Sequence, residues 1–145
     1  MSEPFSETLE RVYQLFCTCP DPNKRENESG WSIKEVLGHL LDSLNNNHQR
    51  LARYNPHGDL AFPAYDQVLF VRRGNYRAFD FDSLLSLWYG YNKLLMHIVA
   101  SIPPDEMDST ITVGNRPATT IAQLAKDYFA HIEVHERQVR RIIAA

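Results

Sequence analysis

The sequence predicts an all-α protein that folds as a four-helix bundle. Two observations support this fold class. Apolar residues recur every three or four positions in four separate stretches of the 145-residue chain. Prolines fall at the edges of these stretches, where they interrupt no helix, and no strand-like alternation competes with the pattern. With 145 residues, of which 43% are hydrophobic, the chain is large enough to form one hydrophobic core, so we expect a single domain over residues 1–145.

The first two helices are predicted in the N-terminal third of the chain. The first carries its apolar stripe over residues 5–16. The second carries a longer stripe over residues 33–51 and begins after Ser32. Ser32 and Glu35 have the spacing of a capping box, in which each side chain accepts a hydrogen bond from the other residue's backbone N–H.

The third and fourth helices are predicted in the second half of the chain. The third carries apolar residues over 84–102, and either Asp80 or Asp82 can cap it. The fourth carries apolar residues over 121–143 and begins after Thr120, which offers a second capping box. Both stripes recur at helical spacing, so both helices have a face to bury.

A long connection, residues 54–79, joins the second helix to the third. Its sequence predicts one short helix over residues 66–73. Four long helices with one such connection favour a bundle over other helical architectures.

Composition excludes several classes of protein. A formal net charge of -3 and a pI near 6.0 give no basic surface for nucleic acid. No apolar run approaches the roughly 20 residues of a membrane span, and no signal peptide is evident, so we expect a cytoplasmic protein. Cys17 and Cys19 are poorly spaced for a mutual disulfide; we expect reduced thiols, and a redox or soft-metal role is the alternative.

Three of the six histidines suggest a metal site. His131 and His135 lie four residues apart, so both imidazoles leave one side of the fourth helix a turn apart, as two ligands of one ion require. His39 flanks the apolar stripe of the second helix. If these two helices face each other, the three imidazoles meet, and the ion keeps open positions as in catalytic sites. The alternative is three histidines that pack in the core.

The other three histidines fit this site less well. His48 points to the opposite side of its helix from His39, and His97 lies outside the apolar stripe of the third helix. His57 lies in a loop that contains proline and glycine. We assign all three to the surface.

Three segments of the sequence carry a family resemblance. They are W-S-I-K-E-V-L-G-H-L-L-D-S from Trp31, F-P-A-Y-D from Phe62 and T-I-A-Q-L-A-K-D-Y-F-A-H-I-E-V-H-E-R-Q-V from Thr120. The chain resembles the DinB-like (DinB/YfiT-like) superfamily of small bacterial four-helix bundles over nearly its whole length. The resemblance implies a divalent metal held by His39, His131 and His135. Some members are metal-dependent thiol transferases or isomerases that use bacillithiol, mycothiol or glutathione, and many have no known activity.

Polar residues after His39 indicate a substrate pocket beside this site. Ser43, Asn46 and Arg50 continue its helical face and offer a hydroxyl, an amide and a guanidinium group. Arg50 has the geometry to bind a substrate carboxylate through two hydrogen bonds. The alternative for each residue is a solvated or packing role.

Residues on the fourth helix are also expected to support the histidines or to line the pocket. Asp127, one turn before His131, is expected to accept the free ring N–H of that histidine, and Gln138 follows His135 on the same side. Tyr128 and Tyr65 are expected as hydrogen-bond donors or as walls of the pocket. Here too the alternative is an ordinary packing or surface role.

Zinc or nickel is the expected ion, because imidazole suits both. Our leading hypothesis is activation of a bound thiol for transfer to a small electrophile. Metal-dependent hydrolysis is a closely related hypothesis. It is less favoured because no acidic residue that could act as a general base lies on the predicted metal face. A non-catalytic metal-binding, ligand-binding or stress-response module is the second class. The resemblance also makes a homodimer plausible. Protons compete for the imidazoles, so we expect metal release below about pH 6.

Overall fold

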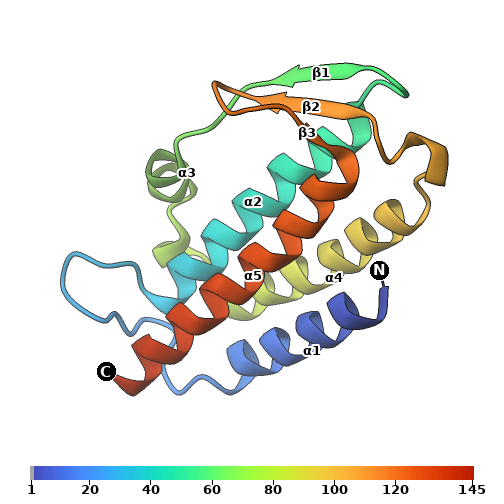
Figure 1. Cartoon of the computed structure of the whole chain (residues 1–145). Helices are drawn as coiled ribbons and strands as arrows, with labels where there is room; N and C mark the ends of the chain where they lie inside the picture. Colours follow the sequence, from blue (N-terminus) through green and yellow to red (C-terminus); the bar gives the residue numbers. More distant parts are fainter. Residues whose placement is uncertain (1) are drawn as a thin grey trace.

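Four long helices form a bundle (Figure 1). A computed structural model describes residues 2–145, with side chains from residue 5 onward. The predicted four-helix bundle is confirmed, and its long helices are α1 (Ser2–Thr18), α2 (Ile33–Arg53), α4 (Phe81–Ala100) and α5 (Ile121–Ala144). The helices α1 and α2 each pack against both α4 and α5, so α1 and α2 lie at opposite corners.

Local sequence signals determine where these helices begin. Ser32 Oγ accepts a hydrogen bond from the Glu35 N–H, and the Glu35 carboxylate accepts one from the Ser32 N–H, both at 3.1 Å. The predicted capping box of α2 is therefore confirmed. Asp80 caps α4, and Thr120 caps α5 by accepting from the Gln123 N–H. The Gln123 side chain bonds further along α5, so the second capping box is only half formed.

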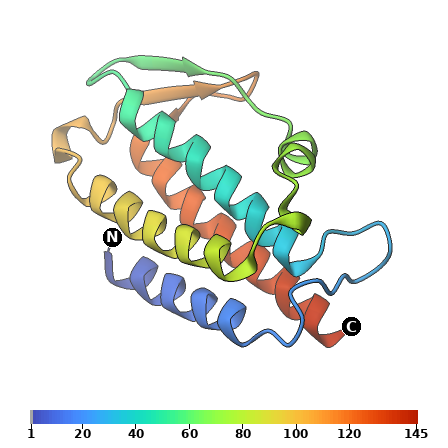
Figure 2. The same cartoon turned by 180° about the vertical axis from the view of Figure 1, so that it is seen from behind.

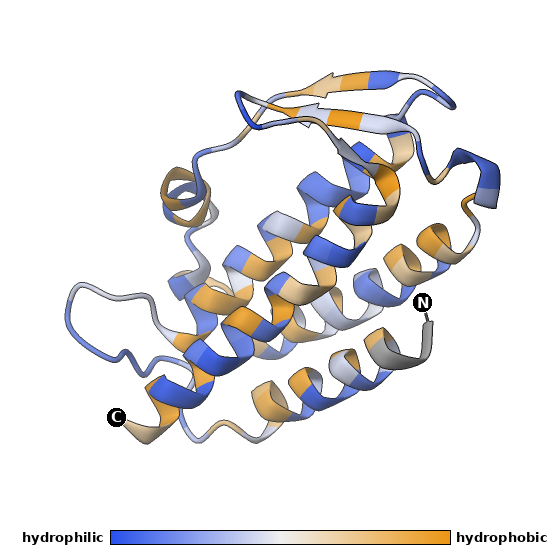
Figure 3. Ribbon diagram, viewed as in Figure 1, coloured by the Kyte–Doolittle hydropathy of each residue, from blue (hydrophilic) through white to orange (hydrophobic). Residues whose placement is uncertain are grey.

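The apolar faces of the four helices enclose one core. Its completely buried side chains include Phe16 of α1, Leu37 and Leu44 of α2, Trp88 of α4 and Ile132 of α5. The Phe16 and Trp88 rings meet edge to face, with centroids 5.8 Å apart. Apolar and polar residues recur in turn along each long helix (Figure 3), which is the pattern that the sequence predicted.

The all-α prediction is wrong in one respect, because the connections between helices form a small sheet. Strand β1 (Asp59–Phe62) pairs in parallel with β2 (Thr110–Val113), which pairs antiparallel with β3 (Thr119–Thr120). Strand β2 does alternate, since Ile111 and Val113 are buried while its threonines are partly exposed. Its four residues are too few for a clear period, and its partner lies far away along the chain. The sheet lies across the end of the bundle where α2 ends and α5 begins (Figures 1 and 2).

The long connection folds against α2. The predicted short helix is confirmed as α3 (Gln67–Gly74), with Asp66 as its cap. A single 3-10 turn, η1 (Tyr76–Ala78), follows it, and another, η2 (Pro104–Glu106), follows α4. The Tyr76 hydroxyl donates to Asp42 on α2 and so fastens the connection to the bundle.

Two further sequence expectations concern the thiols and the membrane. Cys17 and Cys19 are both free, the first exposed and the second partly buried, as expected. Among the helices that the structure describes, none combines the length and the apolar character needed to cross a membrane.

Candidate metal centre

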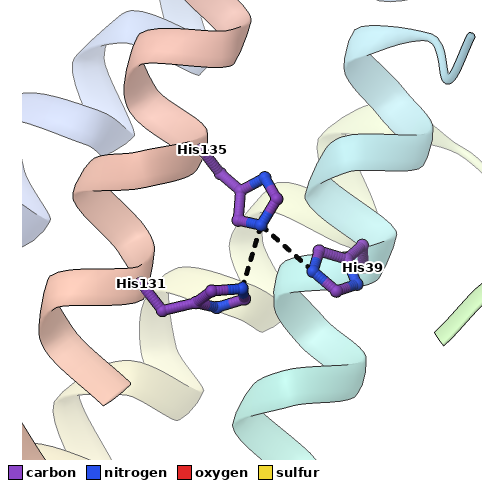
Figure 4. Close-up of side chains that lie close together, drawn as sticks. All are labelled: His39, His131 and His135. Atoms are coloured by element: carbon purple, nitrogen blue, oxygen red, sulfur yellow. Dashed lines mark hydrogen bonds between the residues drawn. The ribbon is translucent and has the colours of Figure 1, made fainter. Parts of the chain in front are cut away.

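Three histidines from two helices meet between α2 and α5 (Figure 4). His39 of α2 is completely buried, and His131 and His135 of α5 are partly buried. The atoms that these residues can offer to a metal ion all lie within 4.8 Å of one another. The structure therefore brings together the three histidines that the sequence singled out.

The Nε2 atoms of the three rings face one another. His135 Nε2 lies 2.9 Å from His131 Nε2 and 3.1 Å from His39 Nε2 (Figure 4). A tetrahedral zinc ion about 2.0–2.1 Å from each nitrogen requires nitrogens roughly 3.3 Å apart. The two separations come within a few tenths of an ångström of that value, so the donor set fits a divalent ion.

The other nitrogen of His135 is held by Gln138. His135 Nδ1 lies 2.7 Å from Gln138 Oε1. An amide oxygen can only accept, so Nδ1 carries the proton and Nε2 presents a lone pair toward the other histidines. Gln138 follows His135 by three positions, which places both on one side of the helix, where the sequence predicted it.

His39 is positioned by its surroundings on α2. The Trp31 ring, just before the helix begins, lies over the imidazole with ring centroids 5.0 Å apart. His39 Nδ1 is buried and has no hydrogen-bond partner among the described residues. A proton on that nitrogen leaves Nε2 free to bind an ion.

Burial keeps the three imidazoles neutral. Desolvation, with a smaller contribution from the neighbouring imidazoles, lowers the pKa of His39 to about 3 and that of His131 to about 4. Burial also lowers the pKa of His135, although its hydrogen bond to Gln138 opposes this. At neutral pH all three rings are therefore available as metal ligands.

A pocket of about 500 Å³ lies beside His131. Its walls come from α2, from α5, from the segment after β1 and from the turn between β2 and β3. Of the residues that the sequence suggested for a substrate pocket, those that line it are Ser43, Arg50, Tyr65, Asp127 and Tyr128.

Asn47, and not the expected Asn46, lines this pocket. The Asn46 amide donates to the backbone oxygen of Asp42, whereas Asn47 is buried and donates to that of Ser43. At 100° per residue, Ser43 and Asn47 lie about 40° and 80° around the helix from His39, and Asn46 lies about 20° to the other side. The pocket thus lies on one flank of His39, which sequence spacing alone does not reveal.

Two of the expected residues line the pocket but form hydrogen bonds to other side chains of the protein. The Tyr128 hydroxyl donates to Asn92 Oδ1 in the core at 2.6 Å, so its proton points away from a substrate. Asp127 is exposed and accepts from Gln123 Nε2 at 2.8 Å rather than from His131. Arg116, from the turn between β2 and β3, also lines the pocket. No sequence signal identified it, because its position depends on strand pairing.

The remaining histidines lie apart from this site. His57 and His97 are exposed, as expected. His48 is partly buried, and its Nδ1 lies 2.6 Å from the Tyr91 hydroxyl on α4. None of the three belongs to the group of metal-binding atoms found among the described residues.

Comparisons with known proteins concern the fold. No protein-family model matches the chain, and no curated protein matches it significantly in sequence. The solved structure of YfiT from Bacillus subtilis matches it with a TM-score of 0.78 and 15% sequence identity, over 97% of this chain and 83% of that one. YfiT is described as a probable metal-dependent hydrolase with an unusual four-helix bundle topology. The chain therefore has the DinB/YfiT-like four-helix-bundle fold that the resemblance in its sequence predicted.

Proposed function

We propose that the protein is a divalent-metal-dependent enzyme whose ion, zinc or nickel, is held by His39, His131 and His135. The observation that carries this proposal is the convergence of three neutral imidazole Nε2 atoms. Three nitrogen ligands suit zinc and nickel and leave a coordination position for a substrate. The description of YfiT, which shares the fold, supports metal dependence.

The proposed reaction is transfer of a low-molecular-weight thiol to a small electrophile. A divalent ion held by His39, His131 and His135 would supply a nucleophile at neutral pH, because it would lower the pKa of a thiol or water bound to it. The thiol would release its proton to solvent, and its sulfur would form a bond to the electrophilic carbon as the bond from that carbon to its leaving group breaks. The leaving group would depart with the bonding electron pair and take up a proton from solvent. The pocket beside His131 receives the acceptor, with the Ser43 hydroxyl and the Asn47 amide in its wall.

Metal-dependent hydrolysis is the second candidate. It is supported by the description of YfiT and by Asp127, which lines the pocket one helical turn before His131. An exposed carboxylate there can accept a proton from an attacking water. Thiol transfer ranks first because a thiol bound to the ion would be fully deprotonated, whereas a bound water would be only partly ionised near neutral pH and would benefit from such a base. A protein that binds metal but turns over neither kind of substrate would be a binding module.

Metal analysis tests the site before any assay of activity. We expect near-stoichiometric zinc or nickel in the wild-type protein by mass spectrometry, and its loss in His39→Ala and in His131→Ala. His97→Ala is the matched control, because His97 is exposed and lies outside the site. A wild-type protein that binds neither ion after reconstitution would overturn the proposal.

Activity assays then separate the two reactions. Thiol transfer requires turnover that depends on both a thiol and an electrophile and that disappears in His135→Ala. Hydrolysis requires turnover of an activated ester or amide without any thiol. Turnover that is unchanged in His135→Ala would exclude the histidine site from either reaction.

A further inference from the structure

The pocket beside the candidate metal centre contains a buried arginine without an acidic partner. Arg50 is only 6% exposed. Its Nη1 makes one long hydrogen bond of 3.4 Å to Asn47 Oδ1, and its Nε has no partner among the described residues. None of the ion pairs found in residues 5–145 includes Arg50. A buried guanidinium normally has a carboxylate partner, because an uncompensated charge is costly to bury.

A second arginine lines the same pocket from a different element. Arg116 lies in the turn between β2 and β3, and its backbone N–H donates to Val113. Gly114 begins this turn with a φ of 56° and donates its N–H to the Phe62 oxygen of β1 at 2.9 Å. The turn is thereby fixed to the sheet, so Arg116 is held on the pocket side of the bundle.

The two arginines lie close enough to affect each other. Burial is the main cause that lowers the pKa of Arg50; the nearby Tyr65 opposes this, and the positive charge of Arg116 adds to the lowering. Two like charges that converge on one pocket repel each other unless an anion lies between them. The guanidinium of Arg50 also lies 5.4 Å from the Phe62 ring centroid, a contact that offsets only part of its charge.

The remaining pocket residues do not neutralise this charge. Among the described residues that line the pocket, Asp127 is the sole carboxylate, and its Oδ1 already accepts from Gln123. The Tyr65 phenol is neutral, because burial raises its pKa. Ser43 and Asn47 are neutral polar residues. The pocket therefore combines two cationic groups with a single carboxylate among its described lining residues, and that carboxylate belongs to α5.

The placement of Arg50 relates this charge to the metal centre. Arg50 follows His39 by eleven residues on α2, an axial rise of about 16 Å, and helical side chains tilt back toward the N-terminus, here toward His39. His131 lines the same pocket. A ligand that reaches the metal centre at one end thus has its other end within the region of the arginines.

We propose that Arg50 and Arg116 form an oxyanion-binding subsite, and that the substrate is an elongated small molecule with an anionic group distant from its metal-binding atom. The subsite itself depends only on the two arginines. The binding of the ligand's other end to a metal ion rests on the proposed function. The planar fork of arginine binds a carboxylate or a phosphate through two hydrogen bonds. The subsite therefore selects for an oxyanion of either kind.

Anion binding to metal-free protein near neutral pH tests this subsite. Succinate and inorganic phosphate are titrated separately against 15N-labelled protein while NMR follows the Arg50 Nε–H and the backbone amides of the β2–β3 turn. We expect saturable shifts with at least one of the two anions, and the stronger binder identifies the oxyanion. Arg50→Gln should weaken that binding roughly 10- to 100-fold, because it removes a charge-assisted pair of hydrogen bonds.

Matched variants make the result specific. Arg53→Gln lies on the same helix but is exposed and bonds to Gln49, so its anion affinity should equal that of the wild type. Arg116 is an exposed turn residue. Arg116→Gln should also weaken anion binding, and this variant tests the subsite if Arg50→Gln lowers the stability of the fold. Arg50→Lys keeps the charge without the fork and should bind with intermediate affinity.

Two outcomes would overturn the subsite. One is the absence of saturable shifts with either anion. The other is equal affinity in the wild type, Arg50→Gln and Arg116→Gln, which would leave Arg50 with the structural role of holding β1 through the Phe62 ring. Zinc content is measured on a separate, zinc-reconstituted sample of the wild type and of every variant. Loss of anion binding with retained zinc supports the subsite, whereas a wild type that binds anions but no metal contradicts only the proposed function.

Discussion

His135 Nδ1 lies 2.7 Å from Gln138 Oε1, on the side of the imidazole that faces away from the other two histidines. This hydrogen bond determines which nitrogen of His135 carries the proton. It therefore leaves the Nε2 lone pair directed at the point where the three rings converge. The contact depends only on residues three apart on α5, so the sequence could predict it.

Removal of this partner should weaken metal binding without abolishing it. We expect Gln138→Leu to lower zinc affinity roughly 10- to 100-fold, because the His135 ring loses the group that orients it. Competition with a chromogenic chelator measures the affinity. Gln123→Leu is the control, since Gln123 lies on the same helix and bonds to Asp127. Equal zinc affinity in Gln138→Leu and the wild type would contradict this role.

Metal retention should extend to a lower pH than the sequence suggested. The ordinary histidine pKa of 6.5 falls to about 3 for His39 and about 4 for His131, mainly through burial. Because a lowered pKa keeps the rings neutral, protons begin to compete for them only well below pH 6.5. Burial lowers the pKa of His135 as well, so all three ligands resist protonation below the ordinary histidine range.

We therefore expect zinc to remain bound at about pH 6 and to be lost between about pH 5 and pH 3. Metal content after dialysis at stepped pH gives the release curve, and circular dichroism at each step shows whether the fold persists. Half-release at or above pH 6.5 would show that burial does not protect the ligands.

A charge network between α1 and α5 should contribute to stability in a pH-dependent way. Glu136 is 6% exposed and accepts from Arg11 at 2.8 and 3.0 Å and from Arg140 at 3.0 Å. The hydrogen bond from Arg11 is the largest of the effects that lower the pKa of Glu136. A carboxylate with a lowered folded-state pKa stabilises the fold above its ordinary pKa of 4.5 and loses this effect as the pH falls through the folded value.

Glu136→Gln should reduce the free energy of unfolding by about 1–2 kcal/mol at pH 7. This difference from the wild type should shrink as the pH falls below about 4.5, because the wild-type carboxylate then becomes protonated. Urea denaturation at several pH values measures it. Glu26→Gln is the control and should change the free energy of unfolding by no more than about 0.5 kcal/mol, because the ion pair of Glu26 with Arg141 is exposed and 3.8 Å long. A loss that does not vary with pH would argue against the ionic network.

Features that depend on neighbouring residues were predictable from the sequence. The Ser32–Glu35 capping box and the spacing of His131 and His135 are set within one helical turn, so a reading of the chain finds them. The convergence of these two histidines with His39 was also predictable from the sequence, because all three flank apolar stripes that must face the core. Helical periodicity thus predicted most of the bundle.

Features that depend on distant pairing were not predictable in the same way. Which of Asn46 and Asn47 faces the pocket depends on where α5 packs against α2, a phase difference of one residue. Arg116 enters the pocket because β2 pairs with β1, and the pairing of Thr110 with Asp59 joins positions far apart in the chain. The sequence near Arg116 contains no sign of that pairing.

A glycine next to a proposed ligand allows close packing of the long connection. Gly38 precedes His39 on α2, and a Cβ at Gly38 would overlap the Tyr76 ring. The Tyr76 hydroxyl donates to Asp42, so the ring cannot move away without losing that bond. We expect Gly38→Ala to reduce the free energy of unfolding by about 1–3 kcal/mol, because overpacking outweighs the better helix propensity of alanine.

Gly90→Ala on α4 is the matched control for this prediction. A Cβ at Gly90 meets no atom within 4 Å, so only helix propensity changes and the variant should be more stable by about 0.5–1 kcal/mol. Chemical denaturation of both variants measures the two effects with opposite signs. Because the clash is with the Tyr76 ring, the double variant Gly38→Ala with Tyr76→Ala should be less destabilised than the sum of the two single changes. If Gly38→Ala proves as stable as Gly90→Ala, the connection does not pack on α2 at this point.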